Sequence, residues 1–210
     1  MVSILIFLSK HKRSEKMREI AYHGTSSKHV DSIKNNGLDP KHSHNRAGHW
    51  LGQGVYFFDD YDKALWWAGC VSKNNDYYEA VFKAQITASD EEVLNLDDKC
   101  QLDKFIDYTI ELSNHIGNEC VGKMPVFNTD TARAVYFDYY KNQYNVSVII
   151  GTFTKPYAGY TEFRNRNKLC KQEEVLKKIG LSFLERQICV SKKECIQAVM
   201  LVYKEDKEVI

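Results

Sequence analysis

The sequence predicts an α+β fold built on an antiparallel or mixed sheet. Strand-like and helix-like segments are intermixed without the strand–helix–strand rhythm of parallel α/β proteins. The 210 residues are enough for one domain with a sizeable core, or for a domain with an insertion. Hydrophobic residues make up 43% of the chain and charged residues 27%, which is ordinary globular composition.

The first predicted strand ends in a His-Gly-Thr segment. Residues 20–23 are apolar, aromatic or β-branched, a composition that favours a strand ending at His23. Serine and threonine hydroxyls accept hydrogen bonds from the first free amides of a helix. We therefore expect a helix to begin just after the strand, capped by one of Thr25, Ser26 and Ser27.

A short helix is expected to follow, because Val30 and Ile33 are three residues apart and share one helical face. Gly37 suits the left-handed position that often ends a helix. Leu38 would then complete the hydrophobic contact of this cap.

A glycine pair precedes the second predicted strand. Gly52 and Gly54 allow a tight bend and the close approach of a ligand. Residues 55–58 read as a buried strand, and Asp59 or Asp60 can cap the next helix. That helix supplies small and apolar contacts from Ala64, Leu65 and Ala68.

The rest of the chain alternates between further elements of both kinds. Apolar alternation indicates strands over residues 79–86, 93–96 and 146–153. Helical spacing indicates helices over residues 103–116, 131–144 and 173–179. Polar loops are expected over residues 41–49 and 157–167. Two strands, over residues 185–191 and 195–202, finish the core.

Charge and cysteine content restrict the cellular setting. The formal net charge is +1, which gives no global bias toward nucleic acid or membrane. The six cysteines show no Cys-x-x-Cys pair, so a reduced cytoplasmic protein is expected rather than a disulfide scaffold. Residues 2–8 are apolar but too short to span a membrane. Basic residues follow this run, the wrong order for a secretory signal, so residues 1–16 are predicted to be an N-terminal extension with Met17 as a candidate start.

Two motifs and their order resemble those of the ADP-ribosyltransferase superfamily, in the branch with a His–Tyr–(Glu/Asp/Gln) triad. That branch includes diphtheria-toxin-like and poly-ADP-ribose-polymerase-like catalytic domains. Its first motif, a strand ending in His-Gly-Ser/Thr, matches residues 23–25, and its Gly-x-Gly-x-Tyr-Phe motif matches residues 52–57. Its third motif, a strand that opens with the last triad residue, resembles residues 185–191, with residues 195–202 as partner strand.

This resemblance implies an ADP-ribosyltransferase-like split mixed or antiparallel sheet with flanking helices. The catalytic domain would span residues 17–210 and would contain a helical insertion at about residues 97–145.

The resemblance also implies NAD as co-substrate, cleaved at the bond between nicotinamide and ribose. His23 would bind a ribose, the Gly24 backbone would hold the carboxamide, and Tyr56 would stack on the nicotinamide. Trp66 or Trp67 would form the other wall of the slot. Fixing ring and ribose in a water-poor site is positional and electrostatic catalysis. The expected NAD-binding residues are His23, Gly24, Thr25, Ser26, Gly54, Tyr56, Trp66 and Trp67.

The third triad residue departs from the usual glutamate, because the preferred alignment places Gln187 there. Glutamine keeps a hydrogen bond to ribose but loses the charge. Glu185 lies two residues earlier and faces the same side of a strand, whereas Arg186 faces away. Glu185 would supply the missing carboxylate or contact the acceptor, and we keep both alternatives together with Gln187.

Polar clusters outside these motifs have simpler interpretations. His42, His44 and His49 lack a nearby cysteine or carboxylate at ligand spacing, so we predict no metal site and interpret their segment as a solvated loop over the NAD cleft. Arg46 in this loop is a candidate contact for the pyrophosphate. Arg164 and Arg166 are either a solvated turn or contacts for an anionic acceptor such as RNA.

The function that follows from the resemblance is transfer of ADP-ribose from NAD to a macromolecular acceptor, protein or RNA/DNA. The family suggests a microbial or phage toxin, defence or effector enzyme, with an antitoxin or immunity protein as a possible partner and no membrane. Two alternatives use the same residues. One is an NAD glycohydrolase, in which water is the acceptor, and the other is an inactive module that binds NAD or a partner.

Overall fold

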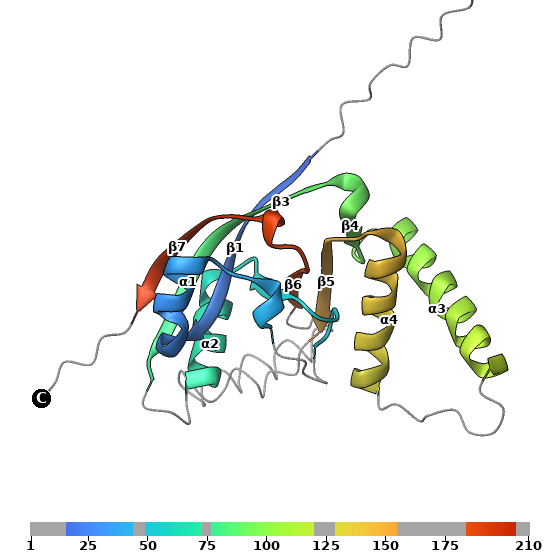
Figure 1. Ribbon diagram of the computed structural model, residues 1–210, viewed down its shortest axis with the longest axis horizontal. Coiled ribbons are helices and arrows are strands. Elements are labelled where there is room, and N and C mark those ends of the chain that lie inside the picture. Colours follow the sequence, from blue (N-terminus) through green and yellow to red (C-terminus); the bar gives the residue numbers. More distant parts are fainter. Residues whose placement is uncertain (1–15, 44–48, 73–76, 120–128, 155–183, 205–210) are drawn as a thin grey trace, which may run out of the picture.

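The computed structural model describes residues 16–43, 49–72, 77–119, 129–154 and 184–204 (Figure 1). Within these residues the chain forms one seven-stranded sheet with strand order β4-β5-β6-β2-β1-β3-β7. β4 and β5 are parallel, and the other neighbouring strands are antiparallel. The strands are β1 (Lys16–Ser26), β2 (Val55–Phe58), β3 (Glu79–Ser89), β4 (Val93–Asn95), β5 (Val148–Thr154), β6 (Leu184–Val190) and β7 (Ile196–Lys204). The predicted α+β class with a mixed sheet is confirmed.

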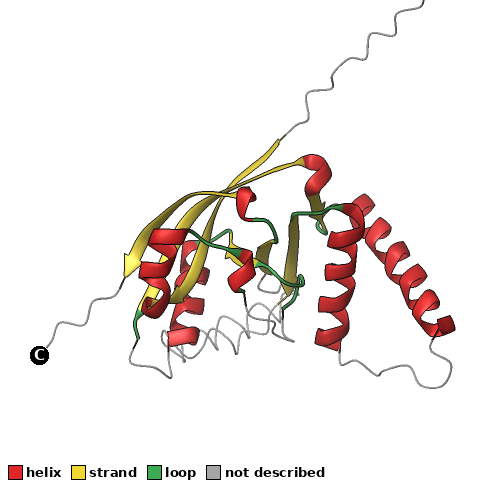
Figure 2. Ribbon diagram, viewed as in Figure 1, coloured by secondary structure: helices red, strands yellow, loops and turns green. Residues whose placement is uncertain are grey.

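Helices flank the sheet in two groups, as Figures 1 and 2 show. α1 (Val30–Asn36) and α2 (Tyr61–Ser72) lie beside β1, β3 and β7. α3 (Lys99–Glu119) and α4 (Thr129–Tyr144) lie together at the β4–β5 end. Residues 97–145 are therefore largely helical where the structure describes them, as predicted. Their status as an insertion stays a prediction.

Alternation along β3 explains how α1 and α2 cover opposite faces of the sheet. Ala80 and Phe82 pack with Val30 of α1, whereas Val81 packs with Ala64 and Ala68 of α2. Successive strand residues point to opposite faces, so one apolar strand serves two helices.

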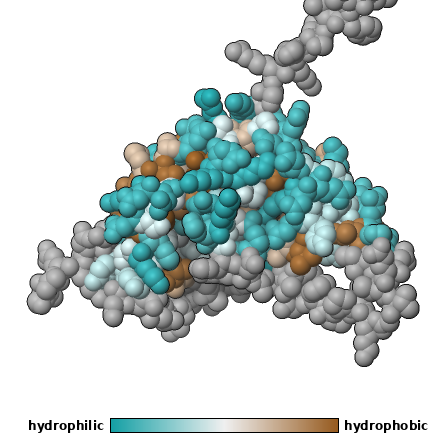
Figure 3. Space-filling model, viewed as in Figure 1, coloured by the Kyte–Doolittle hydropathy of each residue, from teal (hydrophilic) through white to brown (hydrophobic). Residues whose placement is uncertain are grey.

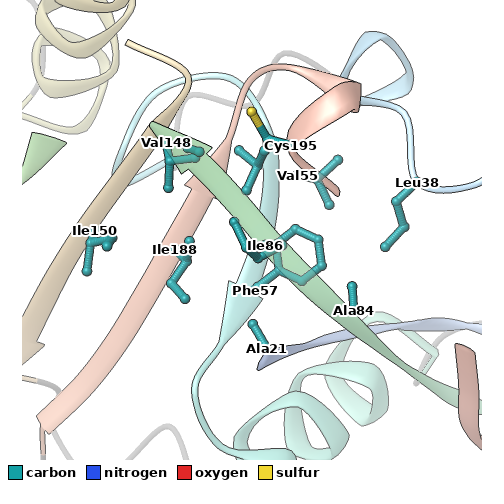
Figure 4. Packing of buried hydrophobic residues seen from close by; sticks show 12 residues of the cluster. Ala21, Leu38, Val55, Phe57, Ala84, Ile86, Val148, Ile150, Ile188 and Cys195 are labelled. Carbon is teal, nitrogen blue, oxygen red and sulfur yellow. The ribbon is translucent and has the colours of Figure 1, made fainter. Parts of the chain in front are cut away.

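The same alternation builds the central core and a second core under α3 and α4. Val148 and Ile150 of β5 point into the central cluster with Ile188 of β6 (Figure 4). Ile149 and Cys189 point the other way, into a cluster with Phe137, Tyr140 and Tyr108. Burial on both faces explains why residues 148–150 of β5 and 188–190 of β6 are all apolar or cysteine.

The sheet is nearly split between β1 and β2, as the resemblance implied. β1 pairs with β3 along its whole length, from Lys16 to Ser26. With β2 it forms a single registered pair, Tyr22 opposite Phe58. The two halves of the sheet are therefore joined by a ladder of one registered residue pair.

Local signals were correct for α2 and only partly correct for α1. Asp60 caps α2 as predicted, its carboxylate accepting from the Lys63 amide at 3.0 Å. Gly37 follows α1 with a φ of 72°. A short 3-10 turn precedes α1, whose N-cap is His29, and no hydroxyl of the preceding segment caps it. The predicted hydroxyl cap was therefore wrong at the start of α1.

One strand pairing was also wrong. β7 was predicted to be the partner of β6, but it pairs with β3 at the far edge of the sheet. β6 instead lies between β2 and β5. The turn between β6 and β7 redirects the chain, and adjacency in sequence gave no warning of this.

The face of the molecule in Figure 3 is mainly hydrophilic, with hydrophobic residues gathered near β7 and near the α3–α4 pair. Exposed apolar residues on these elements include Met200 and Val202 of β7 and Ile106 and Ile110 of α3. Among the described helices, none has both the length and the apolar character needed to cross a membrane.

Glu92 ties three segments together at one end of the sheet. Its carboxylate accepts from the hydroxyls of Ser89 at 2.8 Å and Ser147 at 2.9 Å, and from the Lys192 ammonium at 3.3 Å. These bonds, the one from Ser89 first, lower the pKa of Glu92 from 4.5 to about 2. The carboxylate therefore connects the start of β4 to the start of β5 and to the turn after β6.

We expect Glu92→Gln to destabilise the fold by about 1 kcal/mol at pH 7, because a partly exposed charged acceptor is lost. The pKa of Glu92 is lower in the folded state than in the unfolded state, so its contribution is complete above pH 4.5 and disappears as pH falls toward 2. Urea unfolding of wild type and variant at pH 7 and between pH 4.5 and 2 measures the difference in the free energy of unfolding. Glu91→Gln, an exposed neighbour, is the control. A constant difference down to pH 2 would contradict the assignment.

Candidate functional site

The structure brings the three predicted triad residues onto three neighbouring strands. His23 lies on β1, Tyr56 on β2 and Gln187 on β6, and the sheet order places β2 between the other two. In the β2–β6 ladder, Tyr56 is opposite Cys189 and Phe58 is opposite Gln187. The candidate site is therefore centred on the split in the sheet.

His23 bridges the split with its side chain. Its Nδ1 lies 2.8 Å from the carbonyl oxygen of Tyr56, which can only accept, so Nδ1 carries the proton and donates. The imidazole thus replaces a main-chain bond where the ladder has stopped. The other ring nitrogen, Nε2, keeps its lone pair in the neutral form. Desolvation lowers the pKa of His23 below 6.5 and outweighs the bond to Tyr56, so the ring is neutral at pH 7.

Tyr56 is fixed by its own preceding turn. Its hydroxyl donates to the carbonyl oxygen of Gly52 at 2.7 Å and accepts from the amide of Leu51 at 2.8 Å. Burial raises the pKa of Tyr56, so the phenol stays protonated. Both functions of the hydroxyl are thus occupied, and the ring packs against the core cluster under α3 and α4.

The turn over Gly52–Gly54 is held by α4. The Gln53 amide donates to the carboxylate of Asp138 at 2.7 Å, and the Lys141 ammonium donates to the Gln53 carbonyl at 2.7 Å. Sequence analysis did not single out Asp138 or Lys141. Their i, i+3 spacing was the available signal, but nothing local connects them to a turn 85 residues earlier.

Glu185 and Gln187 lie on one face of β6, as predicted from alternation. Both side chains are buried, and the Gln187 amide nitrogen donates to the Glu185 carboxylate at 2.5 Å. The two residues that the sequence left as alternatives thus form one hydrogen-bonded pair. Which of them contacts a ribose stays a prediction.

Arg186 points to the opposite face, as predicted. Its guanidinium makes a bidentate ion pair with Glu19 of β1, one arm at 2.9 Å. This pair crosses from β6 to β1 past the end of β2, and it is the first cause of the raised pKa of Arg186. It is a second bridge across the split.

The residues after His23 are packed closely. A Cβ at Gly24 would lie 1.9 Å from the carbonyl oxygen of Ala64, so glycine is needed for α2 to approach β1. Thr25 and Ser26 are buried at the end of β1. The predicted NAD contacts of these three residues remain predictions, and Gly24 has a packing role in addition.

The ring that lies beside Tyr56 is that of His49, with centroids 5.2 Å apart. Sequence analysis had placed His49 in a solvated loop over the NAD cleft, without singling it out as a neighbour of Tyr56. Trp66 and Trp67 lie next to each other on α2, with ring centroids 6.2 Å apart, and Trp67 packs against the cluster around Phe58. Their place as a wall of the nicotinamide slot stays a prediction.

Several predicted contacts lie outside the described residues, namely His44, Arg46, Arg164 and Arg166. Across the segments that the structure describes, no three His, Cys, Asp or Glu side chains are grouped so as to hold a metal ion.

Groups of defined chemistry lie on three adjacent strands around the split. The neutral imidazole of His23 lies beside Phe57, with ring centroids 5.8 Å apart, whereas alternation places the Tyr56 ring and the Gln187–Glu185 pair on the other face of the sheet. Hydroxyl groups can donate to the imidazole, and a developing positive charge is stabilised by the carboxylate.

Comparison with known proteins identifies the family of the chain. The family model of the poly(ADP-ribose) polymerase catalytic domain matches residues 7–119, more than half of the chain. The match includes His23 and Tyr56 but stops before α4 and β6. The chain is also 27% identical over 199 residues to the uncharacterized protein MJ0359 of Methanocaldococcus jannaschii, covering 86% of each chain.

We expect Tyr56→Phe to lower the free energy of unfolding by about 1–3 kcal/mol, because the Leu51 amide and the Gly52 carbonyl lose their partner. Tyr22→Phe is the matched control, since that ring makes an edge contact with Tyr61. Chemical denaturation of both variants measures the effect. Equal stability losses in the two variants would show that the Tyr56 hydroxyl does not hold the turn.

Proposed function

Because the chain belongs to the family of poly(ADP-ribose) polymerase catalytic domains, we propose that it transfers ADP-ribose from NAD to a macromolecular acceptor, protein or nucleic acid. One observation supports this most directly. His23, Tyr56 and Gln187 lie on consecutive strands at the point where the sheet splits.

The geometry suggests a role for each side chain. Nε2 of neutral His23 accepts a hydrogen bond from a ribose hydroxyl, because Nδ1 is already committed to Tyr56. The Tyr56 ring packs on the nicotinamide. The bond from ribose C1′ to the nicotinamide nitrogen breaks, its electron pair leaves with nicotinamide, and an acceptor nucleophile attacks C1′. Positive charge develops on the ribose during this step and is stabilised by nearby negative charge.

Glu185 and Gln187 divide the role of the usual glutamate in this proposal. Gln187 donates one amide N–H to Glu185, and its carbonyl oxygen would accept from a ribose hydroxyl. The buried carboxylate of Glu185, two residues before Gln187 on β6, supplies the negative charge.

A binding module without turnover is the second candidate, favoured by the neutral Gln187. NAD would then raise the melting temperature while nicotinamide release stays at background. Hydrolysis of NAD is the third outcome, and it is distinguished by free ADP-ribose without a labelled acceptor. We also propose a microbial or phage toxin or defence setting in the cytoplasm, with an immunity partner.

The test is incubation of the protein with labelled NAD and a whole lysate, followed by nuclease or protease. We expect nicotinamide release and a labelled acceptor, reduced about a hundredfold in His23→Ala and Gln187→Ala because a transition-state contact is lost. Gln197→Ala, an exposed glutamine on β7, is the matched control. Background release by wild type, with and without lysate, would refute the proposal.

The pH profile should report the lowered pKa of His23. Below that pKa Nε2 gains a proton and can no longer accept, so we expect kcat/KM to fall with a midpoint below 6.5. The free energy of unfolding should change with pH in the same direction as kcat/KM. Folding favours the neutral ring, so the contribution of His23 to stability is complete above pH 6.5 and decreases as pH falls through its folded-state pKa. NMR titration of the wild type, compared with His23→Gln, measures the pKa of the His23 imidazole. A titration midpoint at or above 6.5 would contradict the assignment.

A further inference from the structure

Gln53 is the point at which α4 meets the candidate site. Side chains of α4 bind both backbone polar groups of Gln53. Asp138 accepts from the amide and Lys141 donates to the carbonyl, each at 2.7 Å. Its side-chain oxygen accepts from Nδ1 of His49 at 3.0 Å. His49 in turn lies against the Tyr56 ring. One residue therefore connects α4 to both rings.

The glycine before Gln53 lies close against α4. Gly52 has a φ of 78°, a conformation that glycine adopts without strain. A Cβ there would lie 2.4 Å from Oδ1 of Asp138 and 2.8 Å from the ammonium of Lys141. The Gly-x-Gly segment of this chain thus lets the helix approach the turn.

Lys141 is a buried cation with a defined set of acceptors. Its side chain is 6% exposed, and its ammonium contacts the Gln53 carbonyl, Oδ1 of Asp138 at 3.2 Å and Sγ of Cys189 at 3.7 Å. Burying a charge is costly unless it is paired and hydrogen-bonded. The buried pair of Lys141 and Asp138 is therefore weak evidence for a gain in stability. Its geometric effect is to fix the turn at Gln53.

Because α4 holds the turn, it also restricts the position of Tyr56. The Tyr56 hydroxyl is bonded to the carbonyl of Gly52 and the amide of Leu51, within the segment that α4 holds. If the turn moved, the hydroxyl would have to follow it or lose both partners. The position of the ring therefore depends on contacts made by α4.

We propose that Asp138 and Lys141 are positioning residues that set Tyr56 and His49 through Gln53. The inference rests on the proposed function for its kinetic consequence only. α4 lies beyond the residues that the family model matches, so the site is completed by a segment that the match does not include. The two side chains act without touching the substrate.

Two measurements on the full chain test the inference. The first is amide hydrogen exchange of residues 49–58, which needs no activity. The second is kcat and KM for NAD cleavage. The variants are Lys141→Met, which keeps the apolar stem, Asp138→Ala, and Asp138→Asn, which keeps an acceptor for the Gln53 amide. Lys99→Met is the control, because it removes an exposed ion pair to Asp103 on α3.

We expect faster exchange over residues 49–58 in Lys141→Met and Asp138→Ala, and wild-type exchange in Lys99→Met. We expect kcat to fall about a hundredfold with a smaller change in KM, since misplacing a contact group affects the reacting geometry most. Asp138→Asn should recover most of the loss. Should Lys141→Met not fold, the two Asp138 variants carry the same comparison.

The outcomes separate this inference from the proposed function. A wild-type protein without turnover counts against the function, while exchange still decides whether α4 holds the turn. Unchanged exchange in Lys141→Met and Asp138→Ala overturns the inference, whatever the activity. Faster exchange with wild-type kcat and KM overturns the positioning role.

Discussion

The hydrogen bond from His23 to the carbonyl of Tyr56 stands at the weakest point of the sheet. β1 and β2 share one registered pair, so the main chain alone joins the two halves poorly. The imidazole closes the gap on one side, and the ion pair between Arg186 and Glu19 closes it beyond the end of β2. Because backbone groups left open here must find other partners, side chains complete the sheet at the split.

Much of the fold could be predicted because its signals are local. The glycine after α1, the Asp60 cap and the small residues of α2 all act within a few residues of one another, whereas the strand predicted to end at His23 extends from Lys16 to Ser26. Alternation along β6 likewise placed Glu185 and Gln187 on one face and Arg186 on the other. These features follow from backbone geometry and need no knowledge of distant segments.

The rest depended on contacts between segments far apart in the chain. Strand order placed β6 beside β2 and β5, although β7 follows it in sequence. The Gly-x-Gly segment suggested room for a ligand, but a helix formed 85 residues later occupies that room at Gly52. His49 became a neighbour of Tyr56 only through the folded turn. No periodicity or capping pattern encodes such distances.

The position of β6 has a consequence for synthesis of the protein. This strand, residues 184–190, fills the gap between β2, made much earlier, and β5. Until it leaves the ribosome, β2 and β5 each present an open edge, and the third motif is absent. A chain whose central strand arrives late folds through long-range pairing and exposes those edges meanwhile.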